Sequence, residues 1–211
     1  MTKVVFLFKI DKIEESEEMN KKIILASASP RRKELLSSMG LEFEVIPSNV
    51  EENIEQENFS TALIEKLAYE KARNVADKLK VPSLVIGSDT VVVINKHILG
   101  KPKDKKDAFN MLKILSGKTH KVISAIAVID TETGKTLKDF VSSDVNFKTL
   151  SDEEINAYIA TREPMDKAGA YAIQGYAGMF VKSINGCYSN IVGISTYKLA
   201  EMLKEFGVKI F

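Results

Sequence analysis

A run of almost continuous apolar residues at positions 84–94 constrains the fold more than any other feature of the chain. Such a run is typical of a strand that is buried on both faces, in a sheet covered by helices. One carboxylate, Asp89, interrupts it. Because burial of an unpaired charge costs several kcal/mol, Asp89 is either held by donors as a structural element or placed for metal binding or proton transfer. Gly87 and Ser88 leave room for a ligand beside it, which favours a functional role.

Strand-like and helix-like segments alternate along the rest of the chain. Hydrophobic periodicity and capping signals predict helices at residues 30–39, 59–80, 104–115, 151–161 and 195–206. The same reasoning predicts strands at residues 22–26, 41–46, 84–94, 122–130 and 137–147, the last two forming a hairpin. This order implies an α/β domain with a mixed sheet. No repeat or linker divides the chain, so we expect one domain over residues 21–211, preceded by an appendage of unknown role at residues 1–20.

The charge balance excludes several classes of protein. There are 30 basic and 29 acidic residues, so the overall field does not suggest a dedicated nucleic-acid or membrane-surface binder. No apolar run approaches the roughly 18 residues needed to span a bilayer. Cys187 is the single cysteine and cannot form an internal disulfide. These features predict a cytoplasmic protein.

Two cations stand in the first turn of the helix predicted after Ser29. Ser29 is a suitable N-cap and Pro30 a suitable first helical residue. Arg31 and Arg32 follow them and oppose the helix dipole, at a cost of about 0.3–1 kcal/mol each when exposed. A bound anion would offset this cost, so one interpretation is a phosphate cradle of helix N–H groups and two guanidiniums. The alternative is a pair of solvated surface arginines.

Three further positions carry weaker signals. Lys71 falls within the apolar stripe of the helix predicted at 59–80, where it either reaches out to solvent or points into a cleft toward an anion. Lys101 follows a flexible glycine, an arrangement found in ordinary loops about as often as in phosphate sites. Gln174 either belongs to a turn or reads a base through its amide, and the local sequence does not decide between these roles.

Four segments together resemble the signature of the Maf family of nucleotide pyrophosphatases. They are residues 25–32 (LASASPRR), 87–90 (GSDT), 99–102 (LGKP) and 163–175 (EPMDKAGAYAIQG). The resemblance extends over about residues 22–208 in the expected order. It implies a fold similar to that of the inosine triphosphate pyrophosphatases, in which an elongated mixed sheet is flanked by helices and two lobes enclose a central cleft.

The resemblance also implies an activity, the hydrolysis of the α–β phosphoanhydride of nucleoside triphosphates. The YAIQG form of the late motif is similar to the subgroup that acts on dTTP and UTP. By the same match, Asp89 corresponds to the general base, and Arg31, Thr90 and Gln174 correspond to positions associated with substrate choice. The other cleft positions of the family correspond to Ser27, Arg32, Glu52, Lys71 and Lys101.

The chain departs from the family pattern at two places. It reads Gly193-Ile-Ser195 where Gly-Leu-Pro is common, and we expect Ser195 to cap the final helix instead. Ser124 stands where threonine is usual, which keeps the hydroxyl.

The expected cofactor is Mg²⁺ or Mn²⁺, with Glu52 and Asp89 as the candidate ligands. Whether Asp89 serves as a base or as a metal ligand stays open, because both roles use the same carboxylate. The expected partner is a small nucleotide, with neither nucleic acid nor membrane, and members of the family are often homodimers. One alternative is a house-cleaning pyrophosphatase for inosine or xanthosine triphosphate. The other is a non-catalytic, nucleotide-binding regulator of cell division and septum formation, although a pure binder has no evident need for a buried acid beside four cations.

Overall fold

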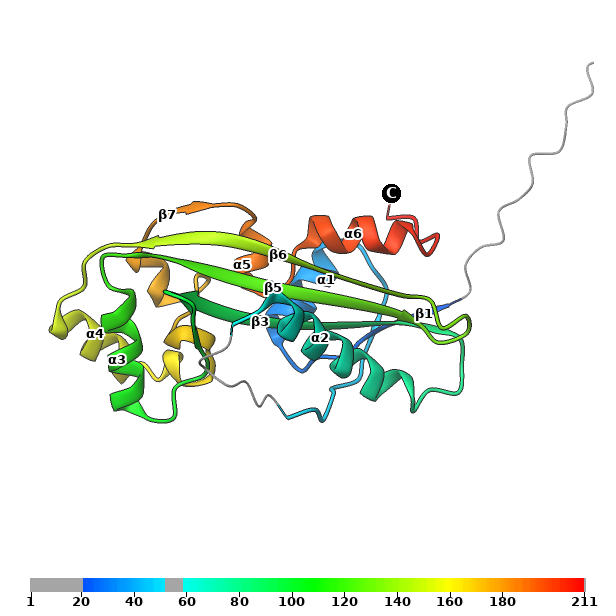
Figure 1. Cartoon of the computed structure of the whole chain (residues 1–211), viewed down its shortest axis with the longest axis horizontal. Helices are drawn as coiled ribbons and strands as arrows, with labels where there is room; N and C mark the ends of the chain where they lie inside the picture. Colours follow the sequence, from blue (N-terminus) through cyan, green and yellow to red (C-terminus); the bar gives the residue numbers. More distant parts are fainter. Residues whose placement is uncertain (1–20, 52–58, 211) are drawn as a thin grey trace, which may run out of the picture.

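The structure is a computed structural model that describes residues 21–51 and 59–210. These residues form one sheet of seven strands flanked by helices (Figure 1). The strands are β1 (Lys22–Leu25), β2 (Glu44–Val45), β3 (Ser83–Ile94), β4 (His97–Leu99), β5 (Thr119–Asp130), β6 (Thr136–Phe147) and β7 (Val181–Asn185). The α-helices are α1 (Pro30–Ser38), α2 (Thr61–Ala76), α3 (Lys105–Leu115), α4 (Asp152–Ala160), α5 (Tyr188–Val192) and α6 (Thr196–Lys204). Three short 3₁₀ helices are η1 (Glu163–Asp166), η2 (Ala168–Ala170) and η3 (Tyr176–Phe180).

The expected α/β class with a mixed sheet is confirmed. The strand order is β2-β1-β3-β5-β6-β7, with β4 paired to β3. Strand β1 runs parallel to β2 and β3, whereas the central strands β3, β5 and β6 are antiparallel neighbours. The long central strands run along the length of the molecule, with α3 and α4 at one end and α1, α2 and α6 toward the other (Figure 1). The helices therefore form two groups on one continuous sheet, as the two-lobed expectation requires.

Different helices cover the two faces of the sheet. Ile24 and Val85 pack in a cluster with α2 on one face. Leu25 and Ile86 pack with α1 and α6 on the opposite face, because successive side chains of a strand point to opposite sides. A third cluster lies with α3 and α4 at the far end. With both faces covered, every residue of β3 except Thr90 is buried, as the apolar run at 84–94 predicted.

Helix α2 approaches β3 very closely at Gly87. A Cβ on Gly87 would overlap the carbonyl oxygen of Ala68 and would lie 2.7 Å from the backbone nitrogen of Ala72. Only glycine permits this distance between a helix and a strand. The close approach brings Lys71, on α2, beside Asp89, two residues beyond Gly87 on β3.

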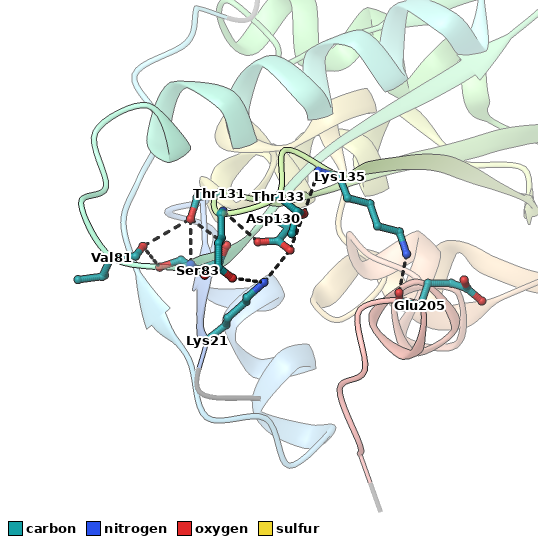
Figure 2. Close-up of polar contacts among 9 residues, drawn as sticks. Lys21, Val81, Ser83, Asp130, Thr131, Thr133, Lys135 and Glu205 are labelled. Carbon is teal, nitrogen blue, oxygen red and sulfur yellow. Dashed lines mark hydrogen bonds and ion pairs between the residues drawn. The ribbon is translucent and has the colours of Figure 1, made fainter. Parts of the chain in front are cut away.

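A polar cluster holds the turn of the β5–β6 hairpin to the start of β3 (Figure 2). Asp130 Oδ2 accepts hydrogen bonds from Lys21 Nζ at 2.8 Å and from Thr133 Oγ1 at 2.7 Å. Thr131 Oγ1 accepts one from the backbone N–H of Ser83 at 2.9 Å. Burial raises the pKa of Asp130, but the bonds from Lys21 and Thr133 outweigh it and hold this pKa below its usual value. The cluster fixes the end of the sheet that lies away from the site described below.

Several residues expected at the ends of helices are confirmed at those positions. Pro30 is the first residue of α1, and Gly40, just beyond its end, has φ +72°, the left-handed conformation expected there. The hydroxyl of Ser195 accepts a hydrogen bond from the backbone N–H of Lys198 at 3.3 Å and so caps α6.

Other boundaries differ from the prediction. The helix expected at 59–80 is shorter, because Ser60 caps it by accepting a hydrogen bond from the N–H of Leu63 at 3.2 Å, and α2 ends at Ala76. The strand expected at 41–46 is reduced to the two residues of β2. Strands β4 and β7, helix α5 and the 3₁₀ helices were not expected, since segments this short show no readable period.

Within residues 21–51 and 59–210, no helix combines the length and the apolar content that a bilayer crossing requires. The expected appendage, residues 1–20, lies outside the described residues. Its separation from a single domain at 21–211 therefore stays a prediction.

We predict that Gly87→Ala lowers the free energy of unfolding by about 1–3 kcal/mol, because the added methyl group forces α2 away from β3. Urea unfolding measures the change. Gly100→Ala is the matched control, since nothing lies within 4 Å of a Cβ at that position, and its stability should equal that of the unmodified protein. Equal unfolding midpoints for the two variants would contradict the argument.

Candidate active site

A cavity of about 430 Å³ lies between the two groups of helices. Its walls come from the start of α1, from α2, from the middle of β3, and from the segments 166–174 and 191–193. Eight of the nine site residues expected from the sequence line this cavity: Ser27, Arg31, Arg32, Lys71, Asp89, Thr90, Lys101 and Gln174. The ninth, Glu52, lies outside the described residues.

Lys71 and Asp89 form a buried ion pair in the wall of the cavity. Lys71 Nζ lies 2.5 Å from Asp89 Oδ1, and the two residues are only 6% and 4% exposed. This burial excludes the interpretation in which Lys71 reaches out to solvent. Removing two charges from water costs several kcal/mol for each ion, which their attraction offsets only in good geometry. Because such a buried ion pair is costly and lies beside a cavity, its two residues are candidate catalytic residues.

The second oxygen of Asp89 has a different environment. In the described structure, Oδ2 is buried and accepts no hydrogen bond, although nearly all buried polar atoms in proteins have a partner. Asp89 thus presents one oxygen held by Lys71 and one that can receive a proton or contact a cation.

The described side chains contain no preformed metal cage. Among residues 21–51 and 59–210, no group of three or more His, Cys, Asp and Glu side chains could hold a metal ion. Mg²⁺, however, is commonly bound by one or two carboxylates together with phosphate oxygens and water. The unpaired oxygen of Asp89 fits this use as a protein ligand. Glu52, the other expected ligand, falls in the segment that the structure does not describe.

Arg32 braces the walls of the cavity. Its Nε donates a hydrogen bond to the carbonyl oxygen of Gly193 at 3.0 Å. Its two terminal nitrogens donate to Ser27 Oγ at 3.2 Å and to Thr90 Oγ1 at 2.9 Å. One guanidinium therefore joins α1, the loop before it, strand β3 and the segment after α5. This bracing was not foreseen, because the sequence suggested the same phosphate-binding task for both arginines.

The carbonyl oxygen of Gly193 collects further donors. Ser88 Oγ and Thr90 Oγ1 each donate to it at 3.1 Å. Thr90 Oγ1 also lies 2.8 Å from Ser124 Oγ, which donates to the carbonyl oxygen of Asn190. The hydroxyl of Ser124 therefore forms hydrogen bonds within the wall of the cavity. Sequence reasoning missed these backbone acceptors, since a carbonyl leaves no side-chain signal.

Arg31 faces the cavity from the first turn of α1. No acidic residue occupies that turn, and the side chain of Ser29 makes no capping hydrogen bond. Helix N–H groups and a half-buried guanidinium consequently meet at one edge of the cavity, which is a suitable arrangement for an anion. Arg31 is partly exposed and lines the cavity, and its role as an anion ligand stays a prediction.

Asp166 and Lys167 contribute charge from the opposite wall, and sequence reasoning assigned neither a role. Lys167 Nζ pairs with Asp166 Oδ1, and the lysine side chain is only 13% exposed. Burial raises the pKa of Asp166, but its bond with Lys167 and the charges of Lys167 and Arg31 keep that pKa below its usual value. The signal available was their place in the late motif, between Glu163 and Gln174.

The late motif is tied to the loop that carries Lys101. The backbone N–H of Gly169 donates to the carbonyl oxygen of Gly100 at 3.0 Å. Gly169 has φ +66°, and a Cβ there would lie 2.8 Å from Val92 Cγ2. Glycine is required on both counts, and the result is that Lys101 and the late motif share one cavity.

A buried histidine supports the same wall. His120 Nε2 lies 2.7 Å from the hydroxyl oxygen of Tyr171, a residue that lines the cavity. His120 is 2% exposed, and Phe147 packs edge-on against its ring. Burial lowers the pKa of His120 to about 4, although the charge of Asp144 acts in the opposite direction. The ring is therefore neutral at pH 7.

We compared the sequence of the whole chain with known protein families. The sequence model described as "Maf-like protein" matches residues 22–206. The chain belongs to the Maf family, and the resemblance read from its motifs is confirmed.

Two relatives cover nearly the same length. A protein of Alkaliphilus oremlandii (strain OhILAs) named dTTP/UTP pyrophosphatase is 54% identical over 184 residues, which cover 87% of this chain and 95% of the relative. A protein of the same name from Desulforamulus reducens (strain ATCC BAA-1160 / DSM 100696 / MI-1) is 52% identical, with 89% of this chain and 98% of the relative covered.

Solved structures show more distant likeness. A HAM1 protein from Coxiella burnetii has a TM-score of 0.48 and 17% identity, with 88% of this chain and 99% of that chain covered. The Ham1 protein of Staphylococcus aureus has a TM-score of 0.42 and 16% identity, with 89% and 100% covered.

We predict that protonation of His120 destabilises the fold in mild acid. Because its pKa is lower in the folded chain than in the unfolded chain, the unfolded chain binds the proton more readily as the pH falls from about 6.5 toward 4. The free energy of unfolding should therefore drop by about 2 kcal/mol between pH 7 and pH 5.

Urea unfolding at the two pH values measures this drop, and the second histidine provides the control. His97 is exposed, so His97→Gln should keep the full pH dependence, whereas His120→Gln should lose most of it. The interpretation is wrong if His120→Gln keeps the same difference between pH 7 and pH 5.

Proposed function

We propose that this chain hydrolyses dTTP and UTP to the nucleoside monophosphate and pyrophosphate. The observation that carries the proposal is the buried pair of Lys71 and Asp89 in a cavity lined by further cations. The shared name of two relatives that match along nearly their whole length supports the choice of pyrimidine substrates.

The chemical step assigned to Asp89 is general base catalysis. A water molecule beside Oδ2 attacks the α-phosphorus, and its oxygen forms the new P–O bond. The bond from the α-phosphorus to the oxygen that bridges to the β-phosphorus breaks, and pyrophosphate departs with the electron pair. Asp89 accepts the proton of the water, while Lys71 fixes the direction of the carboxylate by holding Oδ1.

The cations of the cavity stabilise the leaving group. Negative charge grows on pyrophosphate as the bond breaks, and preorganised cations lower the energy of that state. Arg31, Lys101 and Lys167 line the cavity and are assigned this task. Arg32 is assigned mainly to the integrity of the walls, since three of its nitrogens already donate to protein oxygens.

A divalent cation, Mg²⁺ or Mn²⁺, is part of the proposal. Glu52 and the oxygens of the triphosphate would hold it, and Asp89 Oδ2 would be a further ligand if that oxygen does not serve as the base. When bound, such an ion neutralises phosphate charge and acidifies bound water.

Gln174 is proposed to read the base. It lines the cavity from the same segment as Lys167. A side-chain amide both donates and accepts hydrogen bonds, so it can pair with the N3–H and a neighbouring carbonyl of uracil or thymine. Cytosine instead presents an acceptor at N3 beside a donor at N4, so the amide rejects it only when the cavity wall holds the amide in one orientation.

A cytoplasmic location and a homodimeric assembly complete the proposal. The near-zero net charge supports a small-molecule substrate rather than nucleic acid or a membrane surface as the partner.

We predict that Asp89→Asn lowers the release of pyrophosphate from dTTP and UTP by about 10²–10⁴-fold, the usual contribution of a general base. The control is Asp77→Asn, which changes an exposed carboxylate outside the cavity and should keep full activity. Circular dichroism verifies that both variants are folded. Assays with and without Mg²⁺ or Mn²⁺ test the metal requirement.

A wider panel of nucleotides separates the alternatives. Preference for inosine or xanthosine triphosphate would replace the pyrimidine assignment with the house-cleaning one. Nucleotide binding without turnover of any triphosphate would overturn the catalytic proposal and favour a regulator of cell division.

We predict that Gln174→Ala reduces the preference for UTP over CTP, expressed as a ratio of kcat/KM values, by about tenfold, the worth of one good hydrogen bond. Asn156→Ala, which alters an exposed amide on α4, is the control and should leave the ratio unchanged. An unaltered ratio in Gln174→Ala would remove this residue from base recognition.

A further inference from the structure

Glu163 lies behind the turn that carries Gln174. Its Oε1 accepts a hydrogen bond from the hydroxyl of Tyr158 at 2.9 Å. Its Oε2 accepts one from the backbone N–H of Tyr176 at 3.1 Å. Tyr158 belongs to α4 and is only 3% exposed, so the carboxylate links a buried side chain of α4 to the residue that begins η3. Glu163 does not itself line the cavity.

The same carboxylate occupies the space beside Gly175. A Cβ at Gly175 would overlap the carboxyl atoms of Glu163. The backbone at Gly175 has φ −119° and ψ −157°, a conformation open to any residue. The space that a side chain at Gly175 would need is therefore taken by the neighbouring carboxylate, which packs directly on the peptide that follows Gln174.

These contacts hold a short turn that has few bonds of its own. The N–H of Gly175 donates to the carbonyl oxygen of Ala172 at 3.1 Å, which closes the turn. Hydrogen bonds to an ionised carboxylate are roughly twice as strong as bonds between neutral groups. Burial, together with the bond to Glu163, raises the pKa of Tyr158, so its hydroxyl stays protonated and continues to donate. Glu163 thus joins the turn to the core of the lobe that contains α4.

We propose that Glu163 is a positioning residue that sets the base preference of the cavity by holding Gln174. A binding amide discriminates between bases only when it is kept within about 0.5 Å of the productive geometry. Gln174 is an exposed side chain on a turn, and its direction depends on the backbone that Glu163 clamps from behind. The inference rests on the proposed function, because it assumes that Gln174 reads the base.

The test compares kcat/KM for UTP and CTP, measured as pyrophosphate release, in five variants. Glu163→Ala should reduce the UTP/CTP ratio by about tenfold, as Gln174→Ala does. Glu163→Gln should restore most of the ratio, since its amide oxygen can accept from the N–H of Tyr176 and its amide nitrogen can donate to the oxygen of Tyr158. The double variant Glu163→Ala/Gln174→Ala should be no less selective than Gln174→Ala alone. Glu153→Ala, an exposed glutamate of α4, is the control.

Gly175→Ala provides an independent variant that leaves Glu163 in the chain. Its methyl group displaces the carboxylate without straining the backbone, so it should reproduce the loss of selectivity seen in Glu163→Ala. It carries the test if Glu163→Ala does not fold.

The outcomes separate the inference from the proposed function. If Gln174→Ala changes the UTP/CTP ratio but Glu163→Ala and Gly175→Ala do not, the inference is overturned and the proposed base recognition stands. An equal loss of activity on both nucleotides also overturns it, because that result indicates a structural role alone. If Gln174→Ala leaves the ratio unchanged while UTP is still hydrolysed, base recognition by Gln174 fails and the inference fails with it.

Discussion

The buried ion pair between Lys71 and Asp89 is the interaction on which the arrangement of the surrounding strand, helix and cavity depends. Two charges withdrawn from water are tolerated only at short distance and in a fixed direction. The carboxylate of Asp89 is held on a long, rigid strand, β3, that is buried on both faces. The ammonium of Lys71 comes from helix α2, which packs directly on that strand. Gly87 allows the two backbones to come close enough. The cavity, the opposing cations and the unpaired oxygen of Asp89 are all arranged around this contact.

Much of this arrangement was visible in the sequence, because a charge that violates a local rule is easy to find. Asp89 interrupts an apolar run, Lys71 interrupts an apolar stripe, and Arg31 opposes a helix dipole. All three residues line the same cavity. The alternation of segments likewise predicted the mixed sheet, since long strands and helices carry a clear period. Family resemblance, rather than local physics, supplied Ser27 and Thr90.

The remainder depends on contacts between distant segments, which leave no local pattern. Arg31 and Arg32 have the same local signal, yet only Arg32 donates to a carbonyl 161 positions away. The acceptor there is backbone, so no residue type marks it. The packing of Glu163 against Gly175 is hidden for a similar reason, because a glycine with an ordinary φ gives no conformational sign that its missing side chain matters. Short 3₁₀ helices, which carry the late motif, have too few residues to show a period.

The carbonyl of Gly193 has a consequence for the order in which the protein becomes complete during synthesis. Arg32, Ser88 and Thr90 all donate to it, and Thr90 precedes it by 103 positions. At a translation rate of roughly 5–20 residues per second, Thr90 is made about 5–20 seconds before its acceptor. During that interval a nascent chain already contains Lys71, Asp89 and both arginines of α1 but lacks the peptide that joins the walls. The cavity can therefore reach its final shape only near the end of translation, whatever the speed at which the central strands pair.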